Sequence, residues 1–235
     1  MKHWFLIIIA CLAFQAKAQK LPNSARSKKA IAANAPDLQK ALKAKGMSLG
    51  DPIFMRIFKE SNELEIWIQP KDQEKYSLFK TYKICYYSGD LGPKTKQGDG
   101  QSPEGFYFIN AGRFNPWSSF HLSLNMGYPN AYDRGKKYTG NYLMIHGNCV
   151  SIGCYAMTDE GIEEIYTLAH KAVESGQSYF RVHSFPFRMT NEKMATQTDH
   201  EWYAFWQNLK PGYDWFEEKG TPPNVEVVKG KYTFN

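Results

Sequence analysis

The sequence has no long apolar run beyond its first residues, no internal repeat and no cluster of basic side chains. Its 29 lysines and arginines exceed its 23 aspartates and glutamates, but cations adjoin only in pairs such as Lys28-Lys29 and Lys136-Lys137. Without a basic patch, no nucleic-acid partner is expected. The chain is long enough to bury one substantial hydrophobic core.

The apolar run near the start, Trp4 to Phe14, follows a short basic segment and is too short to span a bilayer as a stable helix. The small residues of Ala16-Lys17-Ala18 suit a signal peptidase, which predicts a signal peptide over 1–18 and a mature chain from Gln19. The alternative takes Cys11 as the lipidated first residue of a lipoprotein. Both predict an exported protein of the periplasm or cell envelope, with no transmembrane segment in the mature chain.

Cysteine is scarce, since the predicted mature chain keeps Cys85, Cys149 and Cys154. In an oxidising compartment an odd number leaves at least one thiol unpaired, and a catalytic role explains such a thiol. The alternative treats all three as small buried apolar residues, with or without a bridge between two of them. Cys149 can form a disulfide with Cys85 or with Cys154. We favour a third possibility, in which Cys149 is a buried or free thiol.

The pattern along the chain predicts three parts after the signal peptide. Residues 19–50 are expected to contain a mobile leader that ends at Pro36 and a short helix over 37–45. Residues 51–188 are expected to form the main domain. Residues 189–235, with aromatic residues at helical spacing, are expected to form a helical C-terminal extension.

Within the main domain, alternation of apolar and polar residues predicts a mainly β fold with helices, in the α+β class. The expected strands cover 53–58, 63–69, 76–87, 105–109, 141–145 and 179–183. The first two are expected to pair as a hairpin. From Ile162 to Val173 the apolar residues take a helical period, with Thr158 as the N-cap and Gly176 as the stop.

One segment carries the residue types that a cysteine nucleophile needs. His146 follows the strand expected at 141–145, and Cys154 comes eight residues later, shortly before the expected helix. A nearby imidazole and the positive end of a helix both favour the thiolate, so we expect the pKa of the thiol to be lowered. Gly147 and Gly153 let the loop fold back, and the amides of Gly153 and Cys154 are the expected oxyanion donors.

The strings His146-Gly147 and Ser151-Ile152-Gly153-Cys154 together resemble the signature of the L,D-transpeptidase catalytic domain family, in a subgroup with a short loop. Upstream, Ser102-Pro103-Glu104-Gly105-Phe106-Tyr107 is similar to a second motif of that family. The resemblance covers roughly 53–185. It implies a β-sandwich catalytic domain with a helix after the nucleophile, and no metal or organic cofactor.

The resemblance also implies a reaction. Cys154 attacks the carbonyl of diaminopimelate in a peptidoglycan stem peptide, forms a thioester and passes the acyl group to an amine, while His146 removes the thiol proton. Many members have His where this chain has Ile152 and Arg where it has Ala156. The alternatives are therefore hydrolysis of the same bond, by an L,D-carboxypeptidase or an amidase that releases peptidoglycan-linked lipoprotein, and a non-catalytic envelope-binding module.

Several neighbours are further candidates for the site. The expected loop and substrate contacts are Gly147, Asn148, Ser151, His121 and Arg134, of which Arg134 is a candidate for binding the carboxylate that Ala156 cannot bind. Ser151 can equally serve only to satisfy the backbone of a tight turn. A zinc site built from His146, Cys149 and Cys154 is the alternative to a nucleophile, although the string offers no obvious fourth ligand.

Overall fold

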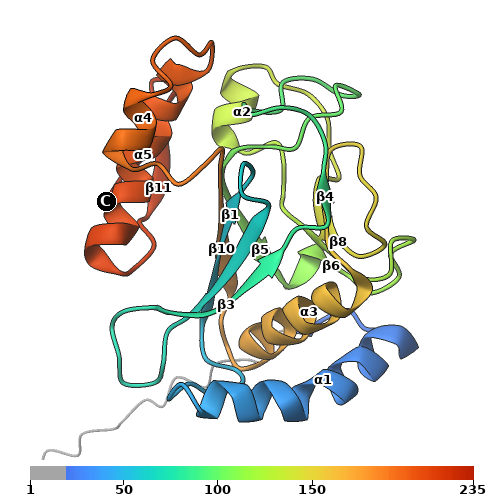
Figure 1. The fold of residues 1–235 in the computed structure, drawn as a ribbon. Coiled ribbons are helices and arrows are strands. Elements are labelled where there is room, and N and C mark those ends of the chain that lie inside the picture. Colours follow the sequence, from blue (N-terminus) through green and yellow to red (C-terminus); the bar gives the residue numbers. More distant parts are fainter. Residues whose placement is uncertain (1–19) are drawn as a thin grey trace, which may run out of the picture.

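The structure, a computed structural model, describes residues 20–235, so the predicted signal peptide and Cys11 lie outside the described residues. It contains two mixed β-sheets, a C-terminal hairpin and helices on both sides (Figure 1). The predicted α+β class is confirmed. No helix among residues 20–235 has the length and apolar character required to cross a membrane.

The first sheet has the strand order β3-β2-β1-β10-β5. Its strands are β1 (Ile53–Phe58), β2 (Glu63–Ile68), β3 (Ser77–Lys83), β5 (Gly105–Asn110) and β10 (Tyr179–Phe185). The predicted hairpin is confirmed, since β1 and β2 pair antiparallel from Ile53–Ile68 to Phe58–Glu63. β1 also pairs with β10 in parallel. A parallel pair needs a long connection, and the intervening chain contains the second sheet and α3.

The second sheet is built from short strands in the order β4-β9-β8-β7-β6. They are β4 (Tyr86–Tyr87), β6 (Phe114–Asn115), β7 (Ser123–Asn125), β8 (Met144–His146) and β9 (Tyr155–Ala156). β8 starts later than the strand predicted at 141–145 because Tyr142 has φ +53°, which does not fit an extended strand. η1 (Ala111–Arg113) and α2 (Ala131–Gly135) lie in the connections.

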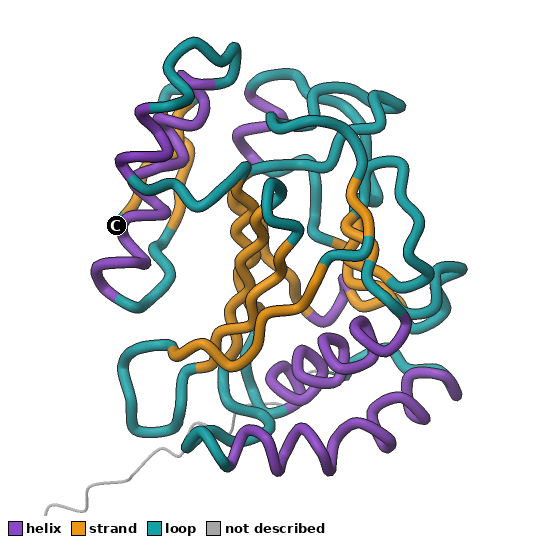
Figure 2. Tube along the Cα trace, in the orientation of Figure 1, coloured by secondary structure: helices purple, strands orange, loops and turns teal. Residues whose placement is uncertain are grey.

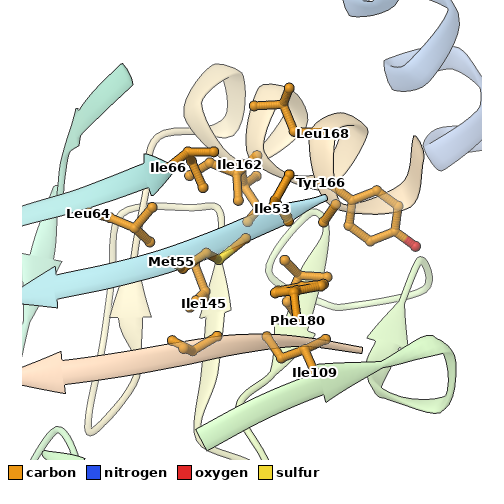
Figure 3. Packing of buried hydrophobic residues seen from close by; sticks show 14 of the residues in the cluster. Ile53, Met55, Leu64, Ile66, Ile109, Ile145, Ile162, Tyr166, Leu168 and Phe180 are labelled. Atoms are coloured by element: carbon orange, nitrogen blue, oxygen red, sulfur yellow. The ribbon is translucent and has the colours of Figure 1, made fainter. Parts of the chain in front are cut away.

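Both sheets share one hydrophobic core with α3 (Asp159–Glu174). Figure 3 shows Met55 and Phe180 of the first sheet, Ile145 of the second sheet and Ile162 of α3 in the same cluster. The predicted helix is confirmed, and the Thr158 hydroxyl accepts a hydrogen bond from the Gly161 amide at its start. This core fixes the second sheet, and therefore His146, against the first.

The N-terminal part departs from the prediction. Instead of a mobile leader and a short helix over 37–45, residues Ala25–Lys43 form one helix, α1, which runs through Pro36 and packs along α3 (Figure 1). The Ser24 and Ser27 side chains form a capping box at its start, and Leu38 and Leu42 are buried. The apolar face of α1 is short, so the sequence shows little periodicity, but packing on α3 stabilises the helix.

The C-terminal part packs on the face of the first sheet opposite to the main core. It comprises α4 (Asn191–Ala195), α5 (Tyr203–Lys219) and the hairpin of β11 (Val225–Val228) and β12 (Lys231–Phe234). Figure 2 shows these elements as a separate layer beside the central strands. A second cluster joins Phe58, Phe106 and Phe185 of the sheet to α5. Since both faces of the central strands are covered, β1 is buried along its whole length.

Candidate active site

His146 and Cys154 lie on adjacent parallel strands of the second sheet. His146 ends β8 and is in register with Ala156 of β9, and Cys154 precedes β9 by one residue. Side chains two residues apart on a strand point to the same face, so His146 and Cys154 share one face of the sheet. Both line a cavity of about 490 Å³. The two predicted catalytic residues are therefore brought together.

The loop between them is cross-linked. A disulfide joins Cys149 to Cys85, which stands next to β4, so the expectation of a buried or free Cys149 is wrong. Cys149 is held further by a hydrogen bond of 3.1 Å from its amide to the Met157 carbonyl oxygen. Sequence spacing cannot show that the two cysteines approach each other across the sheet. The bond also removes Cys149 as a zinc ligand, while Cys154 remains a free thiol.

The His146 side chain is held in one orientation. It is 1% exposed, its Nδ1 lies 2.6 Å from the Gly147 carbonyl oxygen, and the Phe120 ring packs on it at a tilt of 33° with centroids 4.6 Å apart. A carbonyl only accepts, so Nδ1 carries the proton and Nε2 is the basic nitrogen. Burial lowers the pKa of His146, and the bond to Gly147 opposes this in part. The imidazole is therefore neutral at pH 7 and able to accept a proton.

The Cys154 thiol has backbone partners in this structure. Its Sγ accepts from the Met144 amide at 3.4 Å and points toward the Tyr142 carbonyl oxygen at 3.7 Å. Burial raises the pKa of Cys154, although the Met144 hydrogen bond and the charge of Lys94 lower it in part. The expectation of a lowered pKa is thus not met. The pair rests as a neutral thiol and a neutral imidazole, and attack requires proton transfer.

The helix expected shortly after Cys154 begins only at Asp159, beyond β9. β9 and its flanking residues separate Cys154 from the first residue of α3, Asp159. Five residues of nearly extended chain span roughly 15 Å, whereas the effect of a helix dipole is confined to about one turn from the helix end. The first residue of α3 instead binds the loop that contains Asn148, because the Asn148 amide donates a hydrogen bond to Asp159 Oδ1 at 2.8 Å.

Ser151 organises the turn before Cys154. Its hydroxyl accepts from the Gly153 amide at 3.0 Å and donates to the Cys154 carbonyl oxygen at 2.7 Å. The Gly153 amide is therefore already engaged, and the Cys154 amide is the better candidate for an oxyanion donor. Gly153 has φ +147°, a conformation that side chains rarely adopt. In this structure Ser151 and Gly153 therefore determine the shape of the turn.

The upstream motif meets Cys154 in space. Ser102 Oγ donates to the Cys154 carbonyl oxygen at 3.1 Å. Its neighbour Glu104 is fully buried and pairs with Lys59 at 3.1 Å, while its other oxygen accepts from Trp206 Nε1 of α5 at 2.8 Å. The two motifs that are separate in the sequence therefore form one hydrogen-bonded unit, which is anchored to the first sheet and to the C-terminal helix.

Lys94 is a residue of the cavity that sequence reasoning missed. It is 4% exposed, lines the cavity with Cys154, and forms an ion pair of 2.5 Å with Asp99. A second contact runs from its ammonium to the Lys96 carbonyl oxygen at 3.0 Å. In the sequence, Lys94 stands in a glycine-rich turn, where lysines are normally solvated. No local pattern distinguishes a buried lysine from a surface one.

Three predicted contacts lie outside this cavity. His121 Nε2 bonds to Glu163 Oε1 of α3 at 2.8 Å, so its side chain ties the loop before β7 to that helix. The Asn148 side chain is exposed and does not line the cavity. Arg134, on α2, lines a different cavity. Gly147 supplies the carbonyl that orients His146, as described above. The structure thus brings Ser151 and Gly153 to Cys154, but not His121, Asn148 or Arg134.

Comparison with known proteins adds an independent finding. A family model described as the L,D-transpeptidase catalytic domain (YkuD) matches residues 65–225, past the predicted domain boundary at 188. The "Putative L,D-transpeptidase YafK" of Escherichia coli K12 is 49% identical over 184 residues, covering 78% of this chain and 74% of that protein, and the O157:H7 protein matches equally. The solved "helical cell shape determining protein Pgp2" of Campylobacter jejuni covers 81% of this chain and 80% of its own, with 16% identity and a TM-score of 0.45.

Proposed function

Because this chain belongs to the L,D-transpeptidase catalytic domain family, we propose that it is a cysteine-dependent L,D-transpeptidase that acts on peptidoglycan stem peptides in the periplasm. One observation carries the proposal. Cys154 and a neutral, oriented His146 line the same cavity on one face of adjacent strands. A nucleophile and a general base in such an arrangement are the minimum that acyl transfer requires.

The first half-reaction forms a thioester. The Cys154 proton passes to His146 Nε2 as Sγ attacks the diaminopimelate carbonyl, and the tetrahedral oxyanion accepts from the Cys154 amide. The bond from that carbonyl to the terminal D-alanine then breaks, and the imidazolium returns the proton to the leaving amine. The contact with the Phe120 ring and the hydrogen bond at Nδ1 restrict rotation of the imidazole.

The second half-reaction releases the enzyme. An acceptor amine loses a proton to His146 and attacks the thioester, so that a new amide forms and Cys154 leaves as a thiolate that regains its proton. In this proposal the acceptor is an amine on a second peptide, and the exposed side chains of Ile152 (90% exposed) and Val150 (half exposed) at the cavity offer apolar surface against which that peptide can pack. Water would give hydrolysis instead, by the same thioester.

Products distinguish these outcomes. Defined tetrapeptide muropeptides are incubated with the protein, and the products are weighed by mass spectrometry. A crosslinked dimer supports transpeptidation, whereas loss of D-alanine alone supports carboxypeptidation. Release of a lipoprotein from peptidoglycan supports amidase action. Absence of all three products from a folded protein would contradict the proposal and leave a binding module.

Matched variants test the roles of the dyad. Cys154→Ala is expected to abolish turnover and to prevent the mass increment that a carbapenem leaves on the wild-type protein. His146→Gln is expected to keep the thiol but to slow acylation by about two to four orders of magnitude, the usual contribution of a general base. Ser119→Ala, an exposed serine outside the cavity, is the control and should behave as wild type.

A further inference from the structure

A second cavity lies apart from the one at Cys154. It has a volume of about 610 Å³ and is lined by β5 and β10 of the first sheet, by α2 and by the C-terminal hairpin. The two cavities have no lining residue in common. Neither the dyad nor the turn at Ser151 contributes to it, so the proposed reaction leaves this cavity unexplained.

Three arginines line the second cavity from three different elements, namely Arg113 of η1, Arg134 of α2 and Arg181 of β10. We call this the arginine pocket. All three guanidinium groups bond to neutral acceptors. Arg113 donates to the Phe108 and Met126 carbonyl oxygens. Arg134 donates to the Pro129 carbonyl oxygen, and Arg181 to Asn224 Oδ1 at 2.6 Å.

None of the three arginines forms an ion pair within the described residues, although the Asp133 carboxyl lies near enough to Arg134 for that charge to lower its pKa in part. Over residues 20–235, the arginines that form ion pairs are Arg56 and Arg188. Glu226 lines the arginine pocket without pairing with any of its arginines. Burial lowers the pKa of Arg113, and the nearby charge of Arg134 lowers it further. The charges of Arg113 and Arg134 repel each other, and an oxyanion bound between the guanidinium groups would relieve the repulsion.

Other side chains of the arginine pocket also suit an organic anion. His183 is 1% exposed, and both of its ring nitrogens lack a hydrogen-bond partner in the described structure, although buried polar atoms are normally paired. Phe108 and Tyr179 are each 43% exposed and meet edge to face at 5.6 Å. The pocket thus presents cations, a buried polar ring and apolar surface together, which suits a peptide with carboxylates more than a small inorganic ion.

We propose that the arginine pocket is a second binding site for a carboxylate-bearing stem peptide of peptidoglycan, separate from the site of acyl transfer. This rests on the proposed function, which supplies the polymer. Stem peptides carry several carboxylates, including the side-chain carboxylate of diaminopimelate, and a guanidinium binds each in a bidentate manner. The pocket holds a neighbouring peptide of the same polymer while another peptide occupies the cavity at Cys154.

The test measures binding without turnover. Cys154→Ala protein is titrated calorimetrically with a disaccharide tetrapeptide, and two sites are expected. Adding Arg113→Gln and Arg181→Gln should weaken one site by about tenfold or more, since each removes a charged hydrogen bond. Lys136→Gln is the matched control, because it removes a charge two residues after Arg134 but does not line the pocket. Thermal melting confirms that each variant is folded.

The outcomes separate this inference from the proposed function. The proposal that the arginine pocket binds a stem peptide would be overturned if the arginine variant bound the peptide with unchanged affinity, or if Lys136→Gln weakened binding equally. Inorganic phosphate is a second probe, and binding of phosphate without the peptide would overturn the stem-peptide assignment. Carbapenem acylation is measured in parallel on protein that keeps Cys154, and it should be the same with and without the two arginine changes. If Cys154 is not acylated but two-site binding persists, the proposed function fails while the pocket stands.

Discussion

Removal of the Cys85–Cys149 disulfide should lower both the stability and the activity of the protein. The perturbation is the double variant Cys85→Ser/Cys149→Ser, which leaves Cys154 in place and avoids a stray thiol that could pair with it. The bond joins the segment beside β4 to the loop that carries Ser151 and Gly153. Its loss therefore frees the unfolded chain and loosens the turn before the nucleophile.

The magnitude follows from the length of chain that the bond closes. The two cysteines are 64 residues apart, and for a loop of this length the chain-entropy relation gives about 4 kcal/mol at room temperature. Measured values often fall lower, and removal of native disulfides costs roughly 2–5 kcal/mol. We therefore expect the free energy of unfolding to fall by about 2–4 kcal/mol.

Equilibrium unfolding in urea, followed by tryptophan fluorescence and circular dichroism, measures the change, provided that both probes coincide. Cys154→Ser is the control and should keep most of the stability, because it alters no cross-link. Acylation of the double variant by a carbapenem reports the effect on the loop and should be slower than in the wild type. A double variant within about 1 kcal/mol of the parent would refute the reasoning from loop closure.

Three further predictions address the buried charges and the dyad. Lys59→Met should lower the free energy of unfolding by about 3–5 kcal/mol in the urea assay, because Glu104 is left buried without its cation. The double variant Lys59→Met/Glu104→Gln should lose less free energy of unfolding than the sum of the losses in the two single variants. Lys94→Met should slow alkylation of Cys154 by iodoacetamide at neutral pH, since the charge that lowers the pKa of the thiol is lost, and Lys94→Arg should retain more of the rate. In the pH profile of kcat/KM, the acid limb should lie below pH 6.5, because burial lowers the pKa of His146 and the imidazole stays neutral to lower pH. An acid limb above pH 6.5 would contradict the argument from burial.

The sequence predicts the elements whose pattern is local. The hairpin of β1 and β2 alternates cleanly, and α3 has a long apolar face with a capping threonine, so both are found where expected. The pair of His146 and Cys154 can also be predicted from the sequence, because both residues belong to one short segment with two glycines. These features depend on residues that are neighbours in the chain, which is the information that periodicity and motifs contain.

What the sequence does not predict depends on distant partners. α1 is stabilised by α3, the disulfide joins cysteines 64 residues apart, and Lys94 is buried because Asp99 and the loops around the cavity enclose it. The raised pKa of Cys154 has the same origin, since it is burial by the assembled fold that opposes ionisation. The sequence reveals the residues that favour the thiolate but not the desolvation that opposes it.

The charges around the two cavities indicate where we expect the carboxylates of the proposed substrate to bind. Ala156 lies beside His146 and is buried, so no cation can reach the substrate from this position. Lys94 brings a positive charge to the cavity, but its ammonium is already bound by Asp99 and by the Lys96 carbonyl oxygen. An additional carboxylate there would compete with Asp99 for the same donors. The guanidinium groups of Arg134 and Arg181, in contrast, bond to a carbonyl and an amide oxygen and form no ion pair among the described residues, so on our proposal we expect the anionic part of the polymer to bind more favourably there than next to Cys154.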